Sequence, residues 1–475
     1  MCIHKPSDPY QWLTQWLQRN KPRNAAGLTL KKEPVLKGLM LKCDDFEDIH
    51  KLPDAKPHHG VWNWRQTSGG APVYGVGQCH EAGLLFLLQD MAAKGAKKVF
   101  WANCRDEPMV YINGEPCAPR AEDALNVSVD HLFSIEGEEV EAMESRLKRD
   151  VLGFSGVHRG EIGVYYQMAG MTNELRQKKV TEVRSARETF EWLQATSKAA
   201  EDKAYDAQHG PLNVGVPVTC VLREGSDDWL RGTVDADLGD GTFDVVLDSG
   251  ERLEGKIRRE IKAIDMDATG DEAALPRLQY YRIPITDETP PEEKDFDDIV
   301  AMTRDFASSD GANSAMVFTC QMGRGRTTTA MVAASIVWYA SRGWANDKIP
   351  FVDPESPNHM NGEWKGVIRL MAMMEDGLEV KALVDQCIDE CAHIQNLREA
   401  IKDCKDQADT APSSGARSNA FWLKRGQNYL ERYCYLLLFA NYARTAAISG
   451  FSQPFSNWMM QHWGMKRVMK QLVLE

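Results

Sequence analysis

The stretch from Cys320 to Thr327 carries residue types that together can cleave a phosphate ester. Five residues separate Cys320 from Arg326, so a thiolate at the first position can attack a phosphorus atom held by the second. The guanidinium of Arg326 can bind two phosphate oxygens at once, which a lysine cannot do. Gly323 and Gly325 permit backbone angles and a close approach that a Cβ would obstruct. The Thr327 hydroxyl can then hydrogen-bond the sulfur when it leaves.

Apolar segments on both sides of this loop indicate the elements that position it. Residues 317–319 run into Cys320 as a strand, and an Ala, Met and Val run from Thr327 to about Gly343 indicates a helix. The backbone N–H groups of Gln321 to Arg326 would then point at phosphate oxygens, with the positive end of the helix dipole behind them. The same field favours the thiolate form of Cys320. A buried structural cysteine on a sheet is the alternative.

A candidate general acid lies on a loop some thirty residues before the nucleophile. Residues 278–285 have the pattern of a strand, and a helix is predicted from about Glu292 to Ser308. The proline-bounded loop between them contains Asp287, which can protonate the leaving oxygen and then activate water against the phosphocysteine. Glu288 is the nearest rival. A loop acid or a helix cap is the other interpretation of Asp287.

A second group of charged residues follows another predicted strand. Residues 99–104 read as buried, and Arg105-Asp106-Glu107-Pro108 comes next. Charges at the carboxyl end of a buried strand are typical of the functional rim of an open α/β sheet. The predicted catalytic residues are Cys320, Arg326, Asp287 and Thr327. The predicted phosphate-binding residues are Gln321, Met322, Gly323, Arg324, Gly325 and Arg105. We expect neither a metal nor a cofactor.

The composition of the 475-residue chain is that of a soluble globular protein, with 43% hydrophobic and 26% charged residues. No apolar run approaches the roughly 18 residues of a membrane span. The net charge of −13 argues against nucleic acid as a partner. The eleven cysteines lack framework spacing, and no apolar signal-peptide core follows Met1. We therefore expect a cytoplasmic protein.

A run of short predicted strands interrupts the α/β pattern at residues 212–268. Short strands are predicted at 217–222, 229–238, 241–247 and 252–257, separated by Gly, Asp and Ser turns. This segment resembles a small SH3- or Tudor-like β-barrel. Because Trp229 and Phe243 are its only obvious aromatic cage residues, we favour a structural or docking insert whose protein partner is unknown. The expected division is an N-terminal extension (1–60), a phosphatase domain in two parts (61–211 and 269–475) and the insert.

Several separated stretches resemble the paladin family, which is related to the protein-tyrosine-phosphatase-like phytases. They are Val35–Gly38, Val73–Gln78, Asn103–Pro108, Val110–Gly114, Tyr281–Pro284, Thr319–Thr327, Leu430–Tyr433 and Gln453–Trp458. The resemblance covers nearly the whole chain except the insert, and the chain resembles a single unit of what paladins carry in tandem. It implies a cysteine-phosphatase fold, a central mostly parallel sheet flanked by helices.

The resemblance also implies hydrolysis of phosphomonoesters, on inositol phosphates or phosphoinositides. The partner would then be a phosphorylated small molecule or a lipid headgroup, the latter with peripheral membrane contact. Arg324 inside the loop suits a substrate with several phosphates, although it can equally be a solvated arginine. Thr319 stands where most active relatives have histidine. The alternatives are a pseudophosphatase that binds phosphorylated ligands as a scaffold, and a protein-tyrosine or dual-specificity phosphatase.

Overall fold

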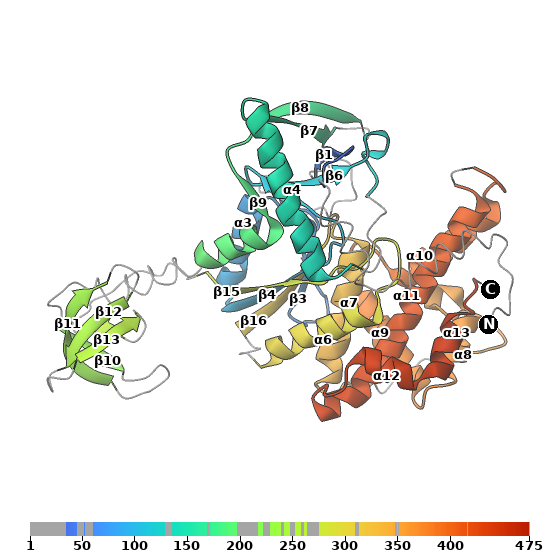
Figure 1. The fold of residues 1–475 in the computed structure, drawn as a ribbon. Coiled ribbons are helices and arrows are strands. Elements are labelled where there is room, and N and C mark those ends of the chain that lie inside the picture. The colour runs from blue at the N-terminus through green and yellow to red at the C-terminus, as the bar shows by residue number, and fades with distance from the viewer. Residues whose placement is uncertain are drawn as a thin grey trace. The chain divides into compact units, whose positions relative to one another are not determined.

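The computed structural model in Figure 1 divides into two compact units, of which the smaller consists of Leu87–Lys98 and Glu191–Leu278. Most of the predicted N-terminal extension lies outside the described residues. Within the described residues, no helix combines the length and the apolar character needed to cross a bilayer. The described residues are 35–44, 52, 60–128, 135–168, 172–196, 217–221, 229–238, 242–247, 252–257, 261–263, 275–308, 313–346, 349, 351–415 and 417–474.

The middle strand of a five-stranded sheet leads into the nucleophile loop. The strand order is β15 (Arg277–Arg282), β4 (Lys98–Asn103), β16 (Ser314–Thr319), β3 (Val73–Val76) and β2 (Arg65–Gln66). All six residues of β16 are buried, which is typical of a strand covered on both faces. β16 runs parallel to β3, and β2 runs antiparallel to β3. Cys320 therefore follows the carboxyl end of the middle strand.

A second sheet of six strands was not predicted. Its order is β8 (Asn173–Lys179), β7 (Glu161–Gln167), β1 (Met40–Cys43), β6 (Glu115–Arg120), β5 (Val110–Ile112) and β9 (Val183–Ser185). Only the β1–β7 pair in this sheet is parallel. The Asn113-Gly114 dipeptide predicts a hairpin. The pairing of β5 with β6 confirms it, and both turn residues have the positive φ that the tight turn needs. The α/β class is thus confirmed, with mixed sheets.

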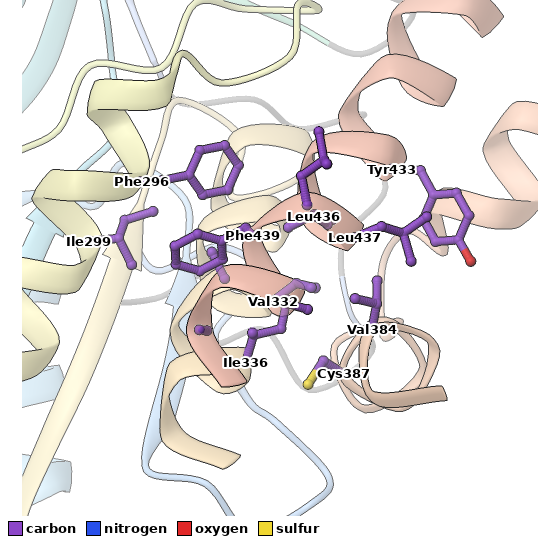
Figure 2. Packing of buried hydrophobic residues seen from close by; sticks show 14 of the residues in the cluster. Phe296, Ile299, Val332, Ile336, Val384, Cys387, Tyr433, Leu436, Leu437 and Phe439 are labelled. Carbon is purple, nitrogen blue, oxygen red and sulfur yellow. The ribbon is translucent and has the colours of Figure 1, made fainter. Parts of the chain in front are cut away.

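Helices supply the rest of the larger unit's core. α7 packs against β3 and β16, and also against α6, α9 and α11. Figure 2 shows Val332 and Ile336 of α7 among side chains of these three helices. The apolar and aromatic run at residues 423–444 predicts a core helix, which α11 confirms. The pattern of residues 378–403 predicts one helix, but the structure has two there, α9 and α10. The helices are α3 (Glu81–Ala93), α4 (Gly137–Val157), α6 (Glu293–Ala307), α7 (Gly325–Ala340), α8 (Lys365–Met371), α9 (Gly377–Glu390), α10 (Leu397–Thr410), α11 (Asn419–Ala446), α12 (Phe455–Gln461) and α13 (Trp463–Met469).

The segment expected to form the insert contains a five-stranded antiparallel sheet. Four of its strands were predicted, and the short β14 was not. Val234, Phe243, Val245 and Leu247 are buried. The likeness to an SH3 or Tudor barrel and the domain boundaries stay predictions. The strand order is β13 (Arg252–Ile257), β12 (Thr242–Leu247), β11 (Trp229–Asp237), β10 (Pro217–Val221) and β14 (Ile261–Ala263).

Candidate active site

A short loop joins β16 to α7 and carries the predicted nucleophile. Cys320 is the first residue after β16, and its exposed fraction is 2%. Arg324 is the N-cap of α7, whose helical residues begin at Gly325. The first N–H groups of a helix have no partner within it, so a helix start of this kind attracts anions. The predicted order of strand, loop and helix is confirmed.

Neighbouring segments bind two carbonyl oxygens of the loop. The N–H of Gln78 donates to the carbonyl of Gln321 over 2.9 Å, and the Asn63 side-chain amide donates to the carbonyl of Met322 over 2.8 Å. With these carbonyls turned toward outside donors, the loop's N–H groups are free to turn inward, as an anion site requires. Neither Asn63 nor Gln78 was predicted as a site residue, although Gln78 ends one of the stretches that resemble the paladin family.

Of the two loop glycines, Gly323 alone is required by its geometry. Gly323 has a φ of +67°, and a Cβ there would come within 2.5 Å of the Gly77 nitrogen and 2.6 Å of the Val76 carbonyl carbon. Backbone atoms cannot rotate away, so this position excludes every side chain. A Cβ on Gly325 would meet its nearest atom, Nη1 of Arg432, only at 3.4 Å. The expectation that a Cβ would be obstructed at Gly325 as well is therefore wrong.

A buried threonine lies at each end of the loop. The Thr319 hydroxyl donates to the Gly77 carbonyl over 3.0 Å, so this residue ties the loop to a neighbouring segment. The Thr327 hydroxyl has no hydrogen-bond partner among the described residues. A buried unpaired hydroxyl is unfavourable unless something completes it. This state leaves Thr327 available for its predicted bond to the sulfur of Cys320.

The guanidinium of Arg326 is buried between two carboxylates. Its Nη1 donates to Oδ1 of Asp106 over 2.6 Å, and its Nε lies 3.3 Å from Oδ1 of Asp287. Burial alone would lower the pKa of Arg326, but Asp287 and Asp106 outweigh burial and raise it. Burial raises the pKa of Asp106, against the opposing effect of Arg326. The arginine is therefore fully charged and already holds oxygen acceptors where a phosphate would bind.

Arg105 lies in a buried ion cluster. Its exposed fraction is 0%, and its guanidinium binds the carboxylates of Asp44 and Glu107, the latter over 2.9 Å. Arg120 also pairs with Glu107, over 2.7 Å. Burial opposes the ionisation of Glu107, but Arg120 and Arg105 outweigh it and lower the pKa of Glu107 to about 2. The structure does not present Arg105 to a ligand, and this predicted phosphate contact is withdrawn because two carboxylates occupy its guanidinium.

The backbone around Asp106 is fixed as well. Arg282 donates from Nε to the carbonyl of Arg105 over 3.0 Å and from Nη2 to that of Glu107 over 3.1 Å. Its Nη1 pairs with buried Glu144 over 2.8 Å. The residues on both sides of Asp106 are therefore held by side chain and by backbone. The sequence analysis singled out this charged run, but it named Arg105 as the site residue and did not name Asp106, which contacts Arg326.

The acid loop, residues 284–291, lies between β15 and α6 and contains both candidate acids. Their carboxylates have different partners. The Asp287 carboxylate is turned toward Arg326, whereas that of Glu288 pairs with Arg425 over 2.7 Å. Glu288 has a φ of +54°, in the left-handed region that non-glycine residues rarely adopt. The Asp287 side chain is 42% exposed, so a leaving group and water can reach it. Of the two acids, the geometry favours Asp287.

Two side chains of the phosphate loop point to different partners. Gln321 donates from Nε2 to Oδ1 of Asp44 over 3.0 Å, so it contributes to a phosphate site through its backbone. Arg324 is partly exposed and forms no ion pair with any described residue. Among the described residues, no group of three His, Cys, Asp or Glu side chains is placed to hold a metal ion. The arrangement offers a thiol, a charged arginine, an exposed acid and the start of a helix, which suits covalent phosphoryl transfer.

Comparisons with known sequences give two kinds of match. A family model described as PTPlike_phytase, inositol hexakisphosphate, matches residues 102–205 and 252–338. A model of the Dpy-30 motif matches residues 1–22, which lie outside the described residues. Paladin from Gallus gallus is 23% identical over 419 residues, 85% of this chain and 39% of that protein. Paladin from Homo sapiens is 33% identical over 194 residues, 40% of this chain and 22% of that protein. The chain thus spans about two fifths or less of the length of these relatives.

Comparison with solved structures gives matches to two phytases. The tandemly repeated protein tyrosine phosphatase like phytase from Mitsuokella multacida has a TM-score of 0.44 and 13% identity, covering 95% of this chain and 54% of that one. A PTP-like phytase from Bdellovibrio bacteriovorus has a TM-score of 0.43 and 14% identity, covering 90% of this chain and 97% of that one.

Proposed function

We infer that this chain, a member of the paladin family, is a cysteine-dependent phosphatase with Cys320 as its nucleophile. The observation that carries this proposal is the buried guanidinium of Arg326, which follows Cys320 in a strand–loop–helix and meets two carboxylates. A structural arginine would need no adjoining cysteine, no side-chain-free position at Gly323 and no exposed acid. The combination fits the binding and transfer of a phosphoryl group.

In the first step, the thiolate of Cys320 attacks phosphorus in line with the leaving oxygen. The S–P bond forms while the P–O bond breaks, and Asp287 gives its proton to the departing oxygen. Arg326 and the loop N–H groups bind the three equatorial oxygens, whose charge grows in the transition state. The phosphate oxygens replace the carboxylate of Asp287 on Nε of Arg326. That exchange releases the acid toward the leaving group.

In the second step, water hydrolyses the phosphocysteine. Asp287, now ionised, takes a proton from the water. The oxygen of this water attacks phosphorus, and the P–S bond breaks. The hydroxyl of Thr327 donates to the leaving sulfur of Cys320, which gives this buried group its partner. Inorganic phosphate then leaves, and both Asp287 and the thiolate regain their starting states.

The proposed substrates are inositol phosphates or the phosphorylated headgroups of phosphoinositides. The family model described by inositol hexakisphosphate supports this class, as does Arg324, which forms no ion pair within the described part of the chain. The proposed location is the cytoplasm, since the nine cysteines whose side chains the structure describes are free thiols. Activity on phosphotyrosine and ligand binding without turnover remain the alternatives.

Steady-state hydrolysis tests the proposal. The wild-type protein should release phosphate from para-nitrophenyl phosphate and faster from inositol polyphosphates, and Cys320→Ser should abolish release from both. Cys320→Ser should still bind inorganic phosphate, because Arg326 and the loop amides remain. Equal phosphate release by wild type and Cys320→Ser would overturn the mechanism. Tight binding of inositol phosphates by an inactive wild type would establish the scaffold instead, and a preference for a phosphotyrosine peptide would change the substrate class.

A further inference from the structure

Three polar side chains of α11 bind the loop that carries Asp287. They are Arg425, Asn428 and Arg432, whose spacing of three and four residues places them on one face of a helix. Nδ2 of Asn428 donates to the carbonyl of Glu288 over 3.0 Å, and Nη2 of Arg432 donates to the carbonyl of Thr289 over 2.7 Å. Arg425 pairs instead with the carboxylate of Glu288. Two of the three contacts therefore hold the loop's backbone.

The backbone of the acid loop has an unfavourable conformation at Glu288. Glu288, between the acid and Thr289, has a φ of +54°, a conformation that persists only where its surroundings enforce it. Inside the loop, the hydroxyl of Thr289 donates to the carbonyl of Thr286 over 3.1 Å. Asn428 and Arg432 thus bind two successive carbonyls of the loop, those of Glu288 and Thr289. They therefore fix the tight turn that directs Asp287 to Arg326.

Arg432 is an unusual residue for this task. Its exposed fraction is 2%, yet it forms no ion pair with any described residue. Burial lowers the pKa of Arg432, against opposing effects of Tyr429, Asp287 and Glu288. The guanidinium of Arg432 contacts the Thr289 carbonyl and lies 5.6 Å from the centroid of the Tyr429 ring, without a carboxylate partner among the described residues. A buried cation without a carboxylate partner is unfavourable for stability. Such a residue is more readily explained by a role in the site than by a role in the fold.

The same guanidinium lies beside the phosphate loop. A Cβ built on Gly325 would come 3.4 Å from Nη1 of Arg432, while Nη2 reaches the acid loop. The helix that carries Arg432 cannot easily yield, because Leu430, Tyr433 and Leu437 on it are fully buried, and Figure 2 shows Tyr433 and Leu437 within the packed core. Arg432 is therefore a rigid link between the two loops that must cooperate.

We propose that Arg432, assisted by Asn428, is a positioning residue that holds the acid loop against the phosphate loop before substrate binds. This inference rests on the proposed function, since Asp287 is taken as the acid. A preorganised acid spares the enzyme the closing motion that other enzymes make with a mobile loop. The two side chains do not touch the reacting atoms and act through Asp287.

Leaving-group dependence tests the proposal. In Arg432→Ala and Asn428→Ala, kcat for aryl phosphates with poor leaving groups should fall roughly 10- to 100-fold, as expected for a misplaced general acid. With activated leaving groups, kcat should stay within about threefold of wild type, because those groups depart without a proton. Arg425→Ala is the matched control, since it removes a contact to a side chain of the same loop, and it should leave both rates unchanged. A uniform loss across all leaving groups in Arg432→Ala and Asn428→Ala would overturn the proposal.

A double variant and the conservative replacement separate positioning from stability. Adding Arg432→Ala to Asp287→Asn should lower kcat no further, because the misplaced acid is already gone. Arg432→Lys keeps one donor to the Thr289 carbonyl and should recover part of the rate on poor leaving groups. Additive losses in the double variant would contradict an action through Asp287.

Hydrogen exchange judges the same proposal without any turnover. Amides of residues 285–291 should exchange faster in Arg432→Ala and in Asn428→Ala, while those of α11 and β16 keep wild-type rates. If Arg432→Ala unfolds, the partly exposed Asn428→Ala carries the test. If the amides of the acid loop exchange at wild-type rates in a folded variant, the positioning role of Arg432 and Asn428 is overturned, even if the protein is an active phosphatase. An inactive wild type with a loosened loop in these variants would overturn only the proposed function.

Discussion

Asp106 and Asp287 contact the same guanidinium, but the molecule supports them in different ways. Asp106 has an exposed fraction of 8%, and the residues on each side of it belong to a buried ion cluster. The Asp287 side chain is 42% exposed, and its loop is held by hydrogen bonds from α11. A fixed, buried carboxylate suits the orientation of Arg326. An exposed carboxylate on a tethered loop suits proton exchange with substrate and water.

The largest expected difference between the two carboxylates is in catalysis. Asp287→Asn should lower kcat by about 10²–10⁴-fold for substrates with poor leaving groups. Asp106→Asn should lower it by roughly tenfold or less, because asparagine still offers an oxygen to Arg326. Rates measured over a series of aryl phosphates give the dependence on the leaving group. If that dependence steepens in Asp106→Asn and not in Asp287→Asn, the roles of the two residues are exchanged.

A fall in pH should lower the stability that the buried ion cluster beside Asp106 contributes to the fold. The pKa of Glu107 is lowered from 4.5 to about 2, so its ion pairs stabilise the fold fully above pH 4.5 and lose that effect as the pH falls toward 2. The shift corresponds to a loss on the order of 3 kcal/mol over that window. Urea unfolding between pH 6 and 2.5 measures it, and Glu107→Gln should show a shallower decline. Parallel pH curves for the two proteins would show that this carboxylate does not drive the acid loss.

The third prediction concerns the pairing of Asp106 with Arg326. Ionised Asp106 is tolerated because it faces Arg326, and Asp106→Ala leaves that buried cation with a single, exposed carboxylate. We expect Asp106→Ala to destabilise the fold by about 1.5–3 kcal/mol, and Asp287→Ala by less than about 1 kcal/mol, since water replaces an exposed partner. Inorganic phosphate should restore more stability to Asp106→Ala than to wild type. Equal destabilisation by the two variants in urea would remove the distinction between a fixed and a tethered carboxylate.

The parts of the site that one contiguous stretch encodes could be predicted from the sequence. Cys320, Arg326 and Thr327 take their places because a buried strand, a short loop and a helix follow one another directly. Asp287 could be predicted because prolines mark its loop. Asp106 and Arg432 are brought in by packing between distant segments. The charged run at residues 105–108 indicated the surroundings of Asp106 but not its contact with Arg326, and no local pattern indicates the contact of Arg432 with the acid loop. Arg105 was misassigned because adjacent residues on a strand-end loop point in different directions, which charge alone does not reveal.

The fold shows the same division. β16 and α7 are strongly apolar and were predicted, and α11 was recognised as a core helix. Apart from the β5–β6 hairpin, the six-stranded sheet was not predicted, because some of its strands lack the usual alternation of apolar and polar residues. β8 consists almost entirely of polar residues, and β6 contains two prolines. The break between α9 and α10 was missed because residues 391–396 contain neither glycine nor proline, which are the usual signals of a helix end.

The order of these parts along the chain has a consequence for the protein's biosynthesis. A ribosome makes the acid loop and Cys320 before it makes α11, and Arg432 follows Cys320 by more than a hundred residues. Because domains fold largely as units during synthesis, and α11 packs against α7 in the same core, we expect the phosphate loop and the acid loop to take their final positions only after α11 has been made. Ordering of the site is therefore a late step in the biosynthesis of this chain.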